Sequence, residues 1–404
     1  MSYTPNLRHL AALIEIENLG SINKAAEAVF ISQSALTQGL GKLEHELGSI
    51  LFDRSATGMY ATLTGRKLIE RVKRALQYFQ HAEKDFKTPT QGKTVPSHRK
   101  LHLNASSAQL RALIAIVEHK NISFAANSLG LAQPTLQRSA RDLEKNLGLP
   151  LFLRSATGVE PTPAALRLAR FASLGLSEIR TGIDAVNEIQ GRMTGRLSIG
   201  ALPLVRTELV PASVNALTTR FPELHISIID GPYDELIHAL LHSRIDIILG
   251  ALREPSPLRE IAQFVLFHDE LSVLVRAEHP MLKHELLQLA DLADFEWIAP
   301  RVGTPSRHRF QNIFKNNKLS EPEHIIECSS TVATRGLLLN TDRVALLSRR
   351  QLLPEIEAGL LSVLPLSLPE SRRPIGLTIR KDWQPTIAQQ SYIDILKTIS
   401  SGYQ

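Results

Sequence analysis

The amino-acid sequence predicts a multidomain protein in which two similar, mainly helical domains precede a larger α/β domain. Three observations support this prediction: the length of 404 residues, an internal repeat in the first half, and a change after residue 196 to short apolar runs that alternate with helical segments. A chain of this length exceeds what one ordinary hydrophobic core holds, so two or three domains are expected.

The composition is that of an ordinary globular protein, with 43% hydrophobic residues, 21% charged residues and a mean hydropathy of -0.04. The chain does not begin with the basic and apolar regions of a secretory signal, and no stretch has the length of a membrane span. A cytoplasmic protein with no membrane contact is therefore expected. Cys328 is the only cysteine, which excludes internal disulfides and a cysteine-based zinc finger.

The basic charge is concentrated in the first half of the chain. Residues 1–196 contain 25 Lys and Arg against 16 Asp and Glu, a net charge of +9, whereas the remainder has a net charge of −3. Such an asymmetry is typical of a polyanion-binding module joined to a module with another task. The alternative is a chance distribution of solvated surface charge.

An internal repeat with an offset of 100 residues organises the first half. Residues 51–58 and 151–158 differ at one position, Asp53 against Leu153. Further identities at the same offset pair Ala25-Ala26 with Ala125-Ala126, Gln33 with Gln133, Leu36 with Leu136, Leu43-Glu44 with Leu143-Glu144, and Leu47-Gly48 with Leu147-Gly148. A duplicated domain is the simplest cause.

Each copy predicts three helices followed by a small β-wing. In the first copy, apolar periodicity predicts a helix over 7–17, a second over 22–29 capped by Ser21, and a third that Ser32 caps and that runs to Leu47. Gly48 would end the third helix, and residues 53–63 suit a wing with a turn at Gly58. The second copy predicts helices over 107–117, 122–129 and 133–147, with a wing around residue 158.

Three short helices with a tight turn before the third, followed by a wing, describe a winged helix-turn-helix whose third helix enters the DNA major groove. Polar side chains at the start of the third helix suit base edges and phosphates, and an arginine in the wing suits backbone phosphate. The alternative is an ordinary solvated helix face. The candidate DNA-binding residues are Ser32, Gln33, Ser34, Thr37, Gln38 and Arg54 in the first copy, and Gln133, Pro134, Thr135, Gln137, Arg138 and Arg154 in the second.

This pattern resembles the DNA-binding region of the LysR-type transcriptional regulators. The motif runs from Ala25-Ala26 through Ser32-Gln33-Ser34-Ala35-Leu36-Thr37 to Leu43-Glu44-x-x-Leu47-Gly48-x-x-Leu51-Phe52-x-Arg54, and it returns from Ala125 to Arg154. A usual family member has one such unit, so the duplication is a departure. The resemblance implies that the helix predicted over 163–188 acts as the family's dimerising linker helix. It therefore implies a homodimer or homotetramer, with four helix-turn-helix units in each dimer.

These patterns divide the chain into 1–87 (first winged helix-turn-helix with a helix of its own), 88–103 (polar linker), 104–162 (second winged helix-turn-helix), 163–192 (linker helix) and 193–404 (effector domain). Each copy has a local weakness in its third helix. Gly39 and Gly41 each cost about 1 kcal/mol relative to alanine. Ala132 replaces the capping Ser32, which costs roughly 1 kcal/mol.

The second half predicts an α/β sheet with parallel strands. The apolar runs are 197–200, 226–229, 245–249, 271–275, 297–298, 344–347 and 376–379. This half resembles the family's effector-binding region, which implies the fold of periplasmic solute-binding proteins, with one subdomain from 195–268 and 352–404 and the other from 269–351. Short segments such as Asp230-Gly231-Pro232-Tyr233 resemble the subgroup named for the galactose-binding-protein regulator, which implies a sugar or a small organic acid as effector.

Ligands of such sheets bind at the carboxyl ends of strands and the amino ends of helices. The candidate effector-binding residues are Leu202, Pro203, Leu204, Arg253, Thr304 and Arg335. Arginine side chains and free amide groups are suited to an anionic or polyhydroxyl ligand.

Two other classes of function are alternatives to a regulator. The sequence has no GxSxG, P-loop, HExxH or strand-associated GxGxxG motif, and its 14 histidines do not have metal-ligand spacing. Neither an enzyme nor a cofactor or metal site is therefore expected. The second alternative is a ligand-binding or protein-interaction module whose helix-turn-helix units are relics. The preferred hypothesis is a regulator that binds double-stranded DNA and responds to a small molecule.

Overall fold

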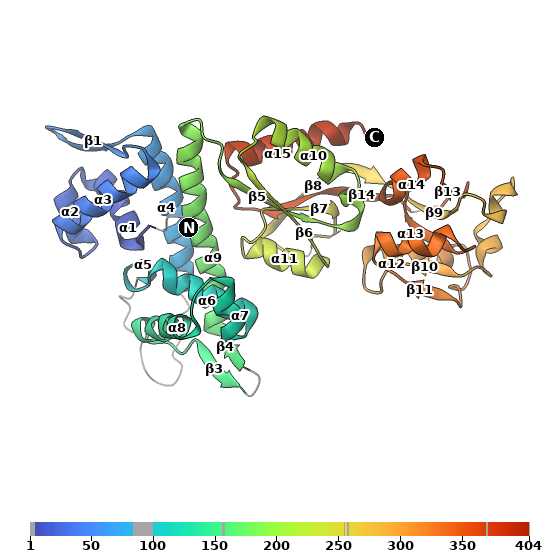
Figure 1. The fold of residues 1–404 in the computed structure, drawn as a ribbon, viewed down its shortest axis with the longest axis horizontal. Coiled ribbons are helices and arrows are strands. Elements are labelled where there is room, and N and C mark those ends of the chain that lie inside the picture. The colour runs from blue at the N-terminus through green and yellow to red at the C-terminus, as the bar shows by residue number, and fades with distance from the viewer. Residues whose placement is uncertain are drawn as a thin grey trace. The chain divides into compact units, whose positions relative to one another are not determined.

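The computed structural model describes residues 5–83, 100–155, 158–253, 255–256, 258–368 and 371–403 (Figure 1). The chain forms two compact units. The N-terminal unit comprises Met1–Arg196 with Leu241–Arg244, and the C-terminal unit comprises Leu197–Leu240 with Ile245–Gln404. Within the described residues, no helix has both the length and the apolar character needed to cross a membrane.

The two sequence repeats fold in the same way. The first copy consists of α1 (Leu7–Leu19), α2 (Ile22–Ala28), α3 (Gln33–Leu47), the strands β1 (Phe52–Ser55) and β2 (Gly58–Ala61), and α4 (Leu63–Glu83). The second copy consists of α6 (Ser107–His119), α7 (Ile122–Ser128), α8 (Gln133–Leu147), the strands β3 (Phe152–Ser155) and β4 (Gly158–Pro161), and α9 (Pro163–Ile189). Each strand pair is an antiparallel hairpin, which is the predicted wing.

Local chemistry sets the ends of the third helices where the sequence predicts them. The hydroxyl of Ser32 accepts a hydrogen bond from the Ala35 amide at 3.2 Å, whereas Ala132 at the same place in the second copy offers no side-chain bond. Gly48 and Gly148 end the two helices with φ of 60° and 67°, the left-handed region that favours glycine. Ser21 was expected to cap α2. It occupies the N-cap position of that helix, but its side chain makes no capping hydrogen bond.

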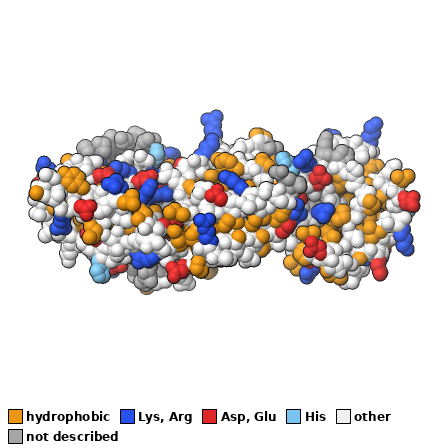
Figure 2. All heavy atoms as spheres, turned by 90° about the horizontal axis from the view of Figure 1, so that it is seen from above, with side chains coloured by type: hydrophobic (Ala, Val, Ile, Leu, Met, Phe, Trp, Pro, Cys, Tyr) orange, Lys and Arg blue, Asp and Glu red, His pale blue; other side chains and the backbone are white. Residues whose placement is uncertain are grey.

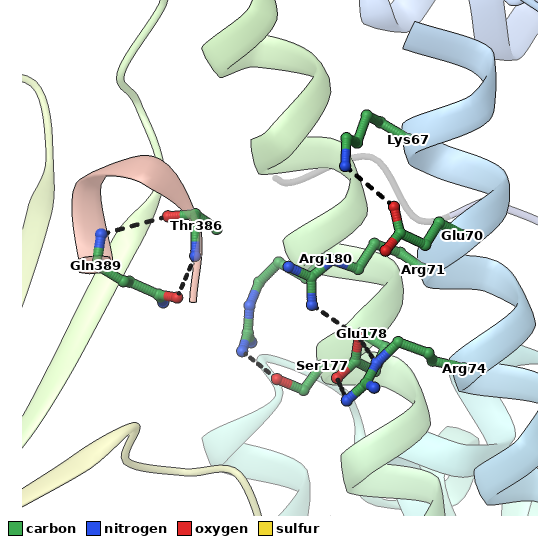
Figure 3. Close-up of polar contacts among 9 residues, drawn as sticks. All are labelled: Lys67, Glu70, Arg71, Arg74, Ser177, Glu178, Arg180, Thr386 and Gln389. Atoms are coloured by element: carbon green, nitrogen blue, oxygen red, sulfur yellow. Dashed lines mark hydrogen bonds and ion pairs between the residues drawn. The ribbon is translucent and has the colours of Figure 1, made fainter. Parts of the chain in front are cut away.

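The long helices α4 and α9 pack against each other in an antiparallel arrangement (Figures 1 and 3). A Cβ atom at Gly175 would lie 2.3 Å from the ring of Phe79, and one at Gly182 would lie 2.9 Å from the Cβ atom of Arg71. The two helix surfaces therefore approach closely where α9 has glycine. Buried side chains of both copies belong to one continuous hydrophobic cluster.

The structure adds to two expectations about this region. Residues 88–99 of the predicted linker lie outside the described residues, but its last part forms the short helix α5 (Leu101–Asn104), and Leu101 is buried in the shared core. Helix α9, which the resemblance assigns to dimerisation, also packs against α4 of its own chain. Its pairing with a second chain stays a prediction.

The C-terminal unit contains two five-stranded mixed sheets. The first has the order β6-β5-β7-β14-β8 and the second has the order β11-β10-β12-β9-β13. The strands of the first sheet are β5 (Arg196–Ala201), β6 (His225–Asp230), β7 (Ile247–Ala251), β8 (Ile261–Asp269) and β14 (Arg373–Arg380). Those of the second are β9 (Leu271–Arg276), β10 (Trp297–Ala299), β11 (Ile325–Glu327), β12 (Val344–Ser348) and β13 (Leu361–Val363).

Helices cover these sheets and connect their strands. They are α10 (Leu209–Arg220), α11 (Tyr233–Leu241), α12 (Pro305–Asn316), α13 (Thr331–Leu339), α14 (Leu353–Glu357) and α15 (Ile387–Ser401), together with the short 3₁₀ helices η2 (Pro203–Arg206), η3 (Pro280–Lys283), η4 (Leu289–Leu292) and η5 (Arg349–Leu352). Aromatic side chains form the centre of the core beside the second sheet. The ring of Trp297 packs edge to face against the rings of Phe310 and Phe314, with distances of 5.4 and 5.2 Å between ring centroids.

The sheets differ from the prediction in two respects. Strands β8, β11 and β13 were not predicted, and each sheet is only partly parallel, because β14 runs antiparallel to β7 and β9 runs antiparallel to β12. The predicted subdomain boundary at residue 352 is too early. Strand β13 pairs with β9, with Leu361 opposite Arg276, so the second subdomain continues beyond residue 352.

Two glycines of the first copy give opposite predictions for the same substitution. A Cβ atom at Gly41 in α3 meets nothing within 4 Å, whereas Gly58 in the wing turn has φ of 143°, a conformation that L residues rarely adopt. We expect Gly41→Ala to raise the free energy of unfolding by about 1 kcal/mol and Gly58→Ala to lower it by about 1–3 kcal/mol. Denaturant unfolding of the full chain measures both. Stabilisation by Gly58→Ala would contradict the strained turn.

Candidate DNA-reading helices and effector site

The predicted DNA-reading side chains of the first copy share one exposed face of α3. Gln33, Ser34, Thr37 and Gln38 are exposed, whereas Leu36 and Leu40 on the opposite face are buried. The hydroxyl of Thr37 donates to the carbonyl of Gln33 at 2.9 Å. Ser32, also predicted to contact DNA, uses its hydroxyl as the helix cap. The amide side chains of Gln33 and Gln38 are therefore the long polar groups at this face.

The second copy repeats this arrangement on α8 with different side chains. Gln133, Pro134, Thr135 and Arg138 are exposed and Gln137 is half-buried, above the buried Leu136 and Ala140. Pro134 lies in the first turn, where a helix needs no amide donor. The two third helices thus present similar but not identical polar rows.

The wing arginine is described in the first copy only. Arg54 lies on β1 opposite Met59 and is exposed. Arg154 has the same place on β3, opposite Val159, but its side chain lies outside the described part of the chain.

One pair of residues with a positioning role was not singled out from the sequence. Oε1 of Glu44 accepts hydrogen bonds from the amides of Leu51 and Phe52 at 2.7 and 3.4 Å, and Glu144 does the same for the second copy at 2.8 and 3.1 Å. These bonds attach each wing to its third helix. The repeated Leu-Glu pair was the signal, but the sequence alone did not show where the carboxylate points.

The positive charge of the N-terminal half does not appear as one continuous patch on the face shown in Figure 2. Lys and Arg side chains there are interspersed with Asp and Glu. Part of the charge is used inside the unit, where Arg71 and Arg74 contact Glu178. The basic charge of the N-terminal half is therefore not gathered into one patch on this face.

The predicted effector residues lie in separate places of the C-terminal unit. Leu202, Pro203 and Leu204 begin the turn after β5, where the Leu202 amide donates to the carbonyl of Leu249 at 2.9 Å and the Leu204 side chain is buried. Thr304 caps α12 by accepting from the Arg307 amide at 3.2 Å, and its hydroxyl donates to the carbonyl of Arg301. The Leu202 amide and the Thr304 hydroxyl therefore form hydrogen bonds within the protein, which stabilise a turn and the start of a helix.

The two predicted arginines have different surroundings. Arg335 on α13 forms an ion pair with Glu355 of α14 at 3.3 Å, which gives it a structural role. Arg253, just after β7, lies over the ring of Tyr233 at 4.2 Å. It also lines a cavity of about 680 Å³ together with the basic residues Arg259 and Lys381.

A buried polar cluster joins the two sheets of the C-terminal unit. Asp269, at the end of β8, accepts hydrogen bonds from the Arg373 guanidinium at 3.2 and 3.3 Å and from the Ser348 hydroxyl at 2.6 Å. Arg373 also donates to the hydroxyl of Ser306 in the first turn of α12 at 2.7 Å. Burial raises the pKa of Asp269, and the nearby Arg373 cation acts in the opposite direction.

This cluster, called the hinge cluster here, lies where the chain crosses from one sheet to the other. Asp269 is separated by one residue from β9 of the second sheet, and Arg373 begins β14 of the first sheet. A change in the relative position of the two sheets would therefore have to include these side chains. The contact of Arg373 with Asp269 joins segments far apart in the sequence, so local sequence patterns do not predict it.

Comparisons with known proteins agree with this architecture. Residues 7–66 and 107–166 each match the bacterial regulatory helix-turn-helix protein model of the lysR family, and residues 190–400 match the LysR substrate binding domain. The chain belongs to the LysR family. LysR regulators bind DNA and small-molecule effectors and act as oligomers, so this chain is a transcription regulator rather than an enzyme.

Two transcriptional regulators are similar to this chain over two thirds of its length or more. GalR, an HTH-type transcriptional regulator of Pseudomonas putida, is 32% identical over 376 residues, which cover 93% of this chain and 92% of GalR. GbpR, an HTH-type transcriptional regulator of Azospirillum brasilense, is 28% identical over 274 residues, which cover 68% of this chain and 80% of GbpR.

Solved structures share the fold. Full-length OxyR of Pseudomonas aeruginosa matches with a TM-score of 0.53 and 20% identity, covering 73% of this chain and 94% of OxyR. CbnR, a LysR family transcriptional regulator, matches with a TM-score of 0.52 and 21% identity, covering 73% of this chain and 99% of CbnR.

The hinge cluster gives a stability prediction for this LysR-family chain. Asp269→Asn would leave the buried Arg373 cation without its counter-charge, so we expect a loss of about 3–5 kcal/mol in unfolding free energy. Asp342→Asn is the matched control, because Asp342 pairs with Arg276 at a half-exposed position and such pairs contribute about 0–1 kcal/mol. Denaturant unfolding compares the two variants. Equal losses would show that the hinge pair has no special weight.

Proposed function

We propose that this regulator reads DNA with the exposed polar rows at the starts of α3 and α8 and that a small organic anion bound by the C-terminal unit controls it in the cytoplasm. One observation carries the first part: the same exposed row of hydrogen-bonding side chains occurs twice, each above a buried apolar row of a third helix. A helix with this arrangement presents its polar row to the major groove while its apolar row stays in the domain core.

The side chains divide by the type of contact that they suit. Gln33, Gln38 and Gln133 have amide groups that match the paired donor and acceptor of adenine, and Arg138 matches the two acceptors of guanine. Arg54 and Arg154 in the wings suit phosphates, which give affinity without sequence information. Base preference is therefore assigned to α3 and α8, and salt dependence mainly to the wings.

Arg138 allows this division to be tested. We expect Arg138→Ala to weaken binding to the selected DNA site by about 1–3 kcal/mol and to relax the preference at one base pair, because a bidentate contact to guanine would be lost. Lys145→Ala, also exposed on α8 but in its last turn, is the control and should leave the base preference unchanged. Fluorescence anisotropy on a panel of single-base-pair variants measures both. An unchanged preference in Arg138→Ala would remove this residue from base reading.

The second part of the proposal rests on the cavity beside Arg253. Its described lining residues include Arg253, Arg259 and Lys381 and none with a carboxylate, and its volume of about 680 Å³ suits a small metabolite. Guanidinium groups form strong paired hydrogen bonds with carboxylates. We therefore favour a small organic acid over a sugar, the other effector class expected from the sequence.

The choice between these effector classes can be measured by thermal stabilisation of the purified protein with panels of small carboxylates and of sugars. We expect a carboxylate to stabilise the protein, and Arg253→Ala to weaken its binding about 10-fold or more, because a charge-assisted hydrogen bond contributes about 1.5–3 kcal/mol. Lys397→Ala on α15, an exposed position, should leave binding unchanged. Stabilisation by sugars alone, insensitive to Arg253→Ala, would contradict the anion proposal.

A further inference from the structure

We infer that one chain by itself recognises both halves of a two-part DNA site and that the two halves differ in sequence. Each winged helix-turn-helix copy, called a head below, contacts one half-site: the first head has α3 as its third helix and the second has α8. This inference rests on the proposed reading of DNA by α3 and α8 and adds that both helices of one site belong to one chain. It is drawn from the packing of α4 against α9 and from the differences between the two copies.

The α4–α9 interface relates the two copies by an approximate two-fold axis. The contacts pair Leu68 and Arg71 with Gly182, Arg74 with Glu178, and Phe79 with Gly175, so residue numbers rise along α4 as they fall along α9. Since the copies are related by an offset of 100 residues, an antiparallel pair of the corresponding helices is the arrangement that two identical subunits would adopt around a two-fold axis. Here the two partners are parts of one chain.

The side chains of the interface favour the pairing of α4 with α9 over the pairing of α4 with a second α4 or of α9 with a second α9. Phe79 fits against Gly175, where a Cβ atom would come within 2.3 Å of its ring. The residue that corresponds to Gly175 in the first copy is Ala75, so an α4–α4 pair would place Phe79 against that Cβ atom twice. The residue that corresponds to Phe79 in the second copy is Ile179, so an α9–α9 pair would leave unfilled volume beside Gly175 twice.

Charge favours the same choice. The carboxylate of Glu178, whose side chain is 8% exposed, contacts Arg71 and Arg74 at 3.1 Å (Figure 3). In the second copy the position that corresponds to Arg71 is Phe171, so an α9–α9 pair would bury Glu178 against an aromatic ring without a cation. Burial of an unpaired charge is strongly unfavourable. The interface is therefore specific for one α4 and one α9.

Contacts outside the long helices fix the two heads further. The side chains of Gln190 and Arg192, just after α9, donate to the carbonyls of Gly48 and Leu47 at the end of α3, both at 2.9 Å. On the other side, Asn146 of α8 donates to the carbonyl of Asn104 in α5 at 3.0 Å. Arg8 of α1 donates to the carbonyl of Leu103 in α5 at 2.8 Å. The third helices of both copies are thus held by one body.

This arrangement changes what kind of DNA site is recognised. Two identical heads around a true two-fold axis require two identical, inverted half-sites. The two heads of this chain carry different rows, with Ser34 and Gln38 on α3 at the positions of Pro134 and Arg138 on α8. Each head therefore selects its own half-site, and the site as a whole has no palindromic symmetry.

The test uses the full-length chain and the DNA site that it selects from random duplexes. We expect two unlike half-sites in opposite orientations. Synthetic sites that carry either half-site twice should bind at least 10-fold more weakly than the selected site, because one head then meets the wrong bases. Equal or tighter binding to a symmetric site would overturn the inference.

Complementation tests whether both heads come from one chain. The first variant carries Gln33→Ala with Gln38→Ala, and the second carries Gln133→Ala with Arg138→Ala; all four positions are exposed, so folding should not change. Each variant alone should bind at least 10-fold more weakly, and mixtures refolded together should bind no better. A mixture with the wild-type footprint would show that the two heads on one site come from different chains, and the inference would fail while the DNA-reading residues stood.

The remaining outcomes separate the inference from the proposed function. Loss of binding in one variant only would show that a single head reads DNA, which overturns the inference and leaves a regulator with one reading helix. Unchanged binding in both variants would overturn the proposed reading residues and the inference together.

Discussion

The N-terminal half of this protein depends on the antiparallel packing of α4 against α9. Close approach at Gly175 and Gly182 and the burial of Glu178 between Arg71 and Arg74 make this interface tight and specific. Without this interface, each copy would expose the apolar face of its long helix. A domain of about 80 residues buries only a limited share of its surface, so each copy alone would have a small core. With the interface, buried side chains of both copies join in one hydrophobic cluster.

The interface also explains why a duplicated copy can be accommodated in a LysR-family chain. The extra copy supplies the α4 face that covers α9, and its third helix, α3, ends against residues that follow α9. Each copy keeps the glutamate, Glu44 or Glu144, that ties its wing to its third helix. Both heads thus retain the same internal geometry, while their exposed residues are free to differ.

Much of the fold could be predicted from the sequence where the cause is local. The bounds 33–47 and 133–147 of the third helices agree with the structure because periodicity, the Ser32 cap and the end glycines act within a few residues. Pairings between distant segments were not predictable. The partner of α9, the pairing of β13 with β9 and the contact of Asp269 with Arg373 join segments far apart in sequence.

The candidate sites show the same division. Exposure of Gln33, Gln38, Gln133 and Arg138 follows from helix periodicity, so the sequence could point to these side chains. The effector residues were harder to predict because hydrogen bonding decides their roles. Arg335 pairs with Glu355 and the Thr304 hydroxyl is used within its own loop, whereas Arg253 lines a cavity.

The most direct test of the α4–α9 interface is chemical cross-linking of an equal mixture of light and heavy-isotope chains that were unfolded and refolded together. Cross-links between α4 (Leu63–Glu83) and α9 (Pro163–Ile189) should join light to light and heavy to heavy chains only, because both helices of the interface belong to one chain. Light-to-heavy cross-links between these segments in statistical proportion would contradict it, since they would show that α4 and α9 pair between chains.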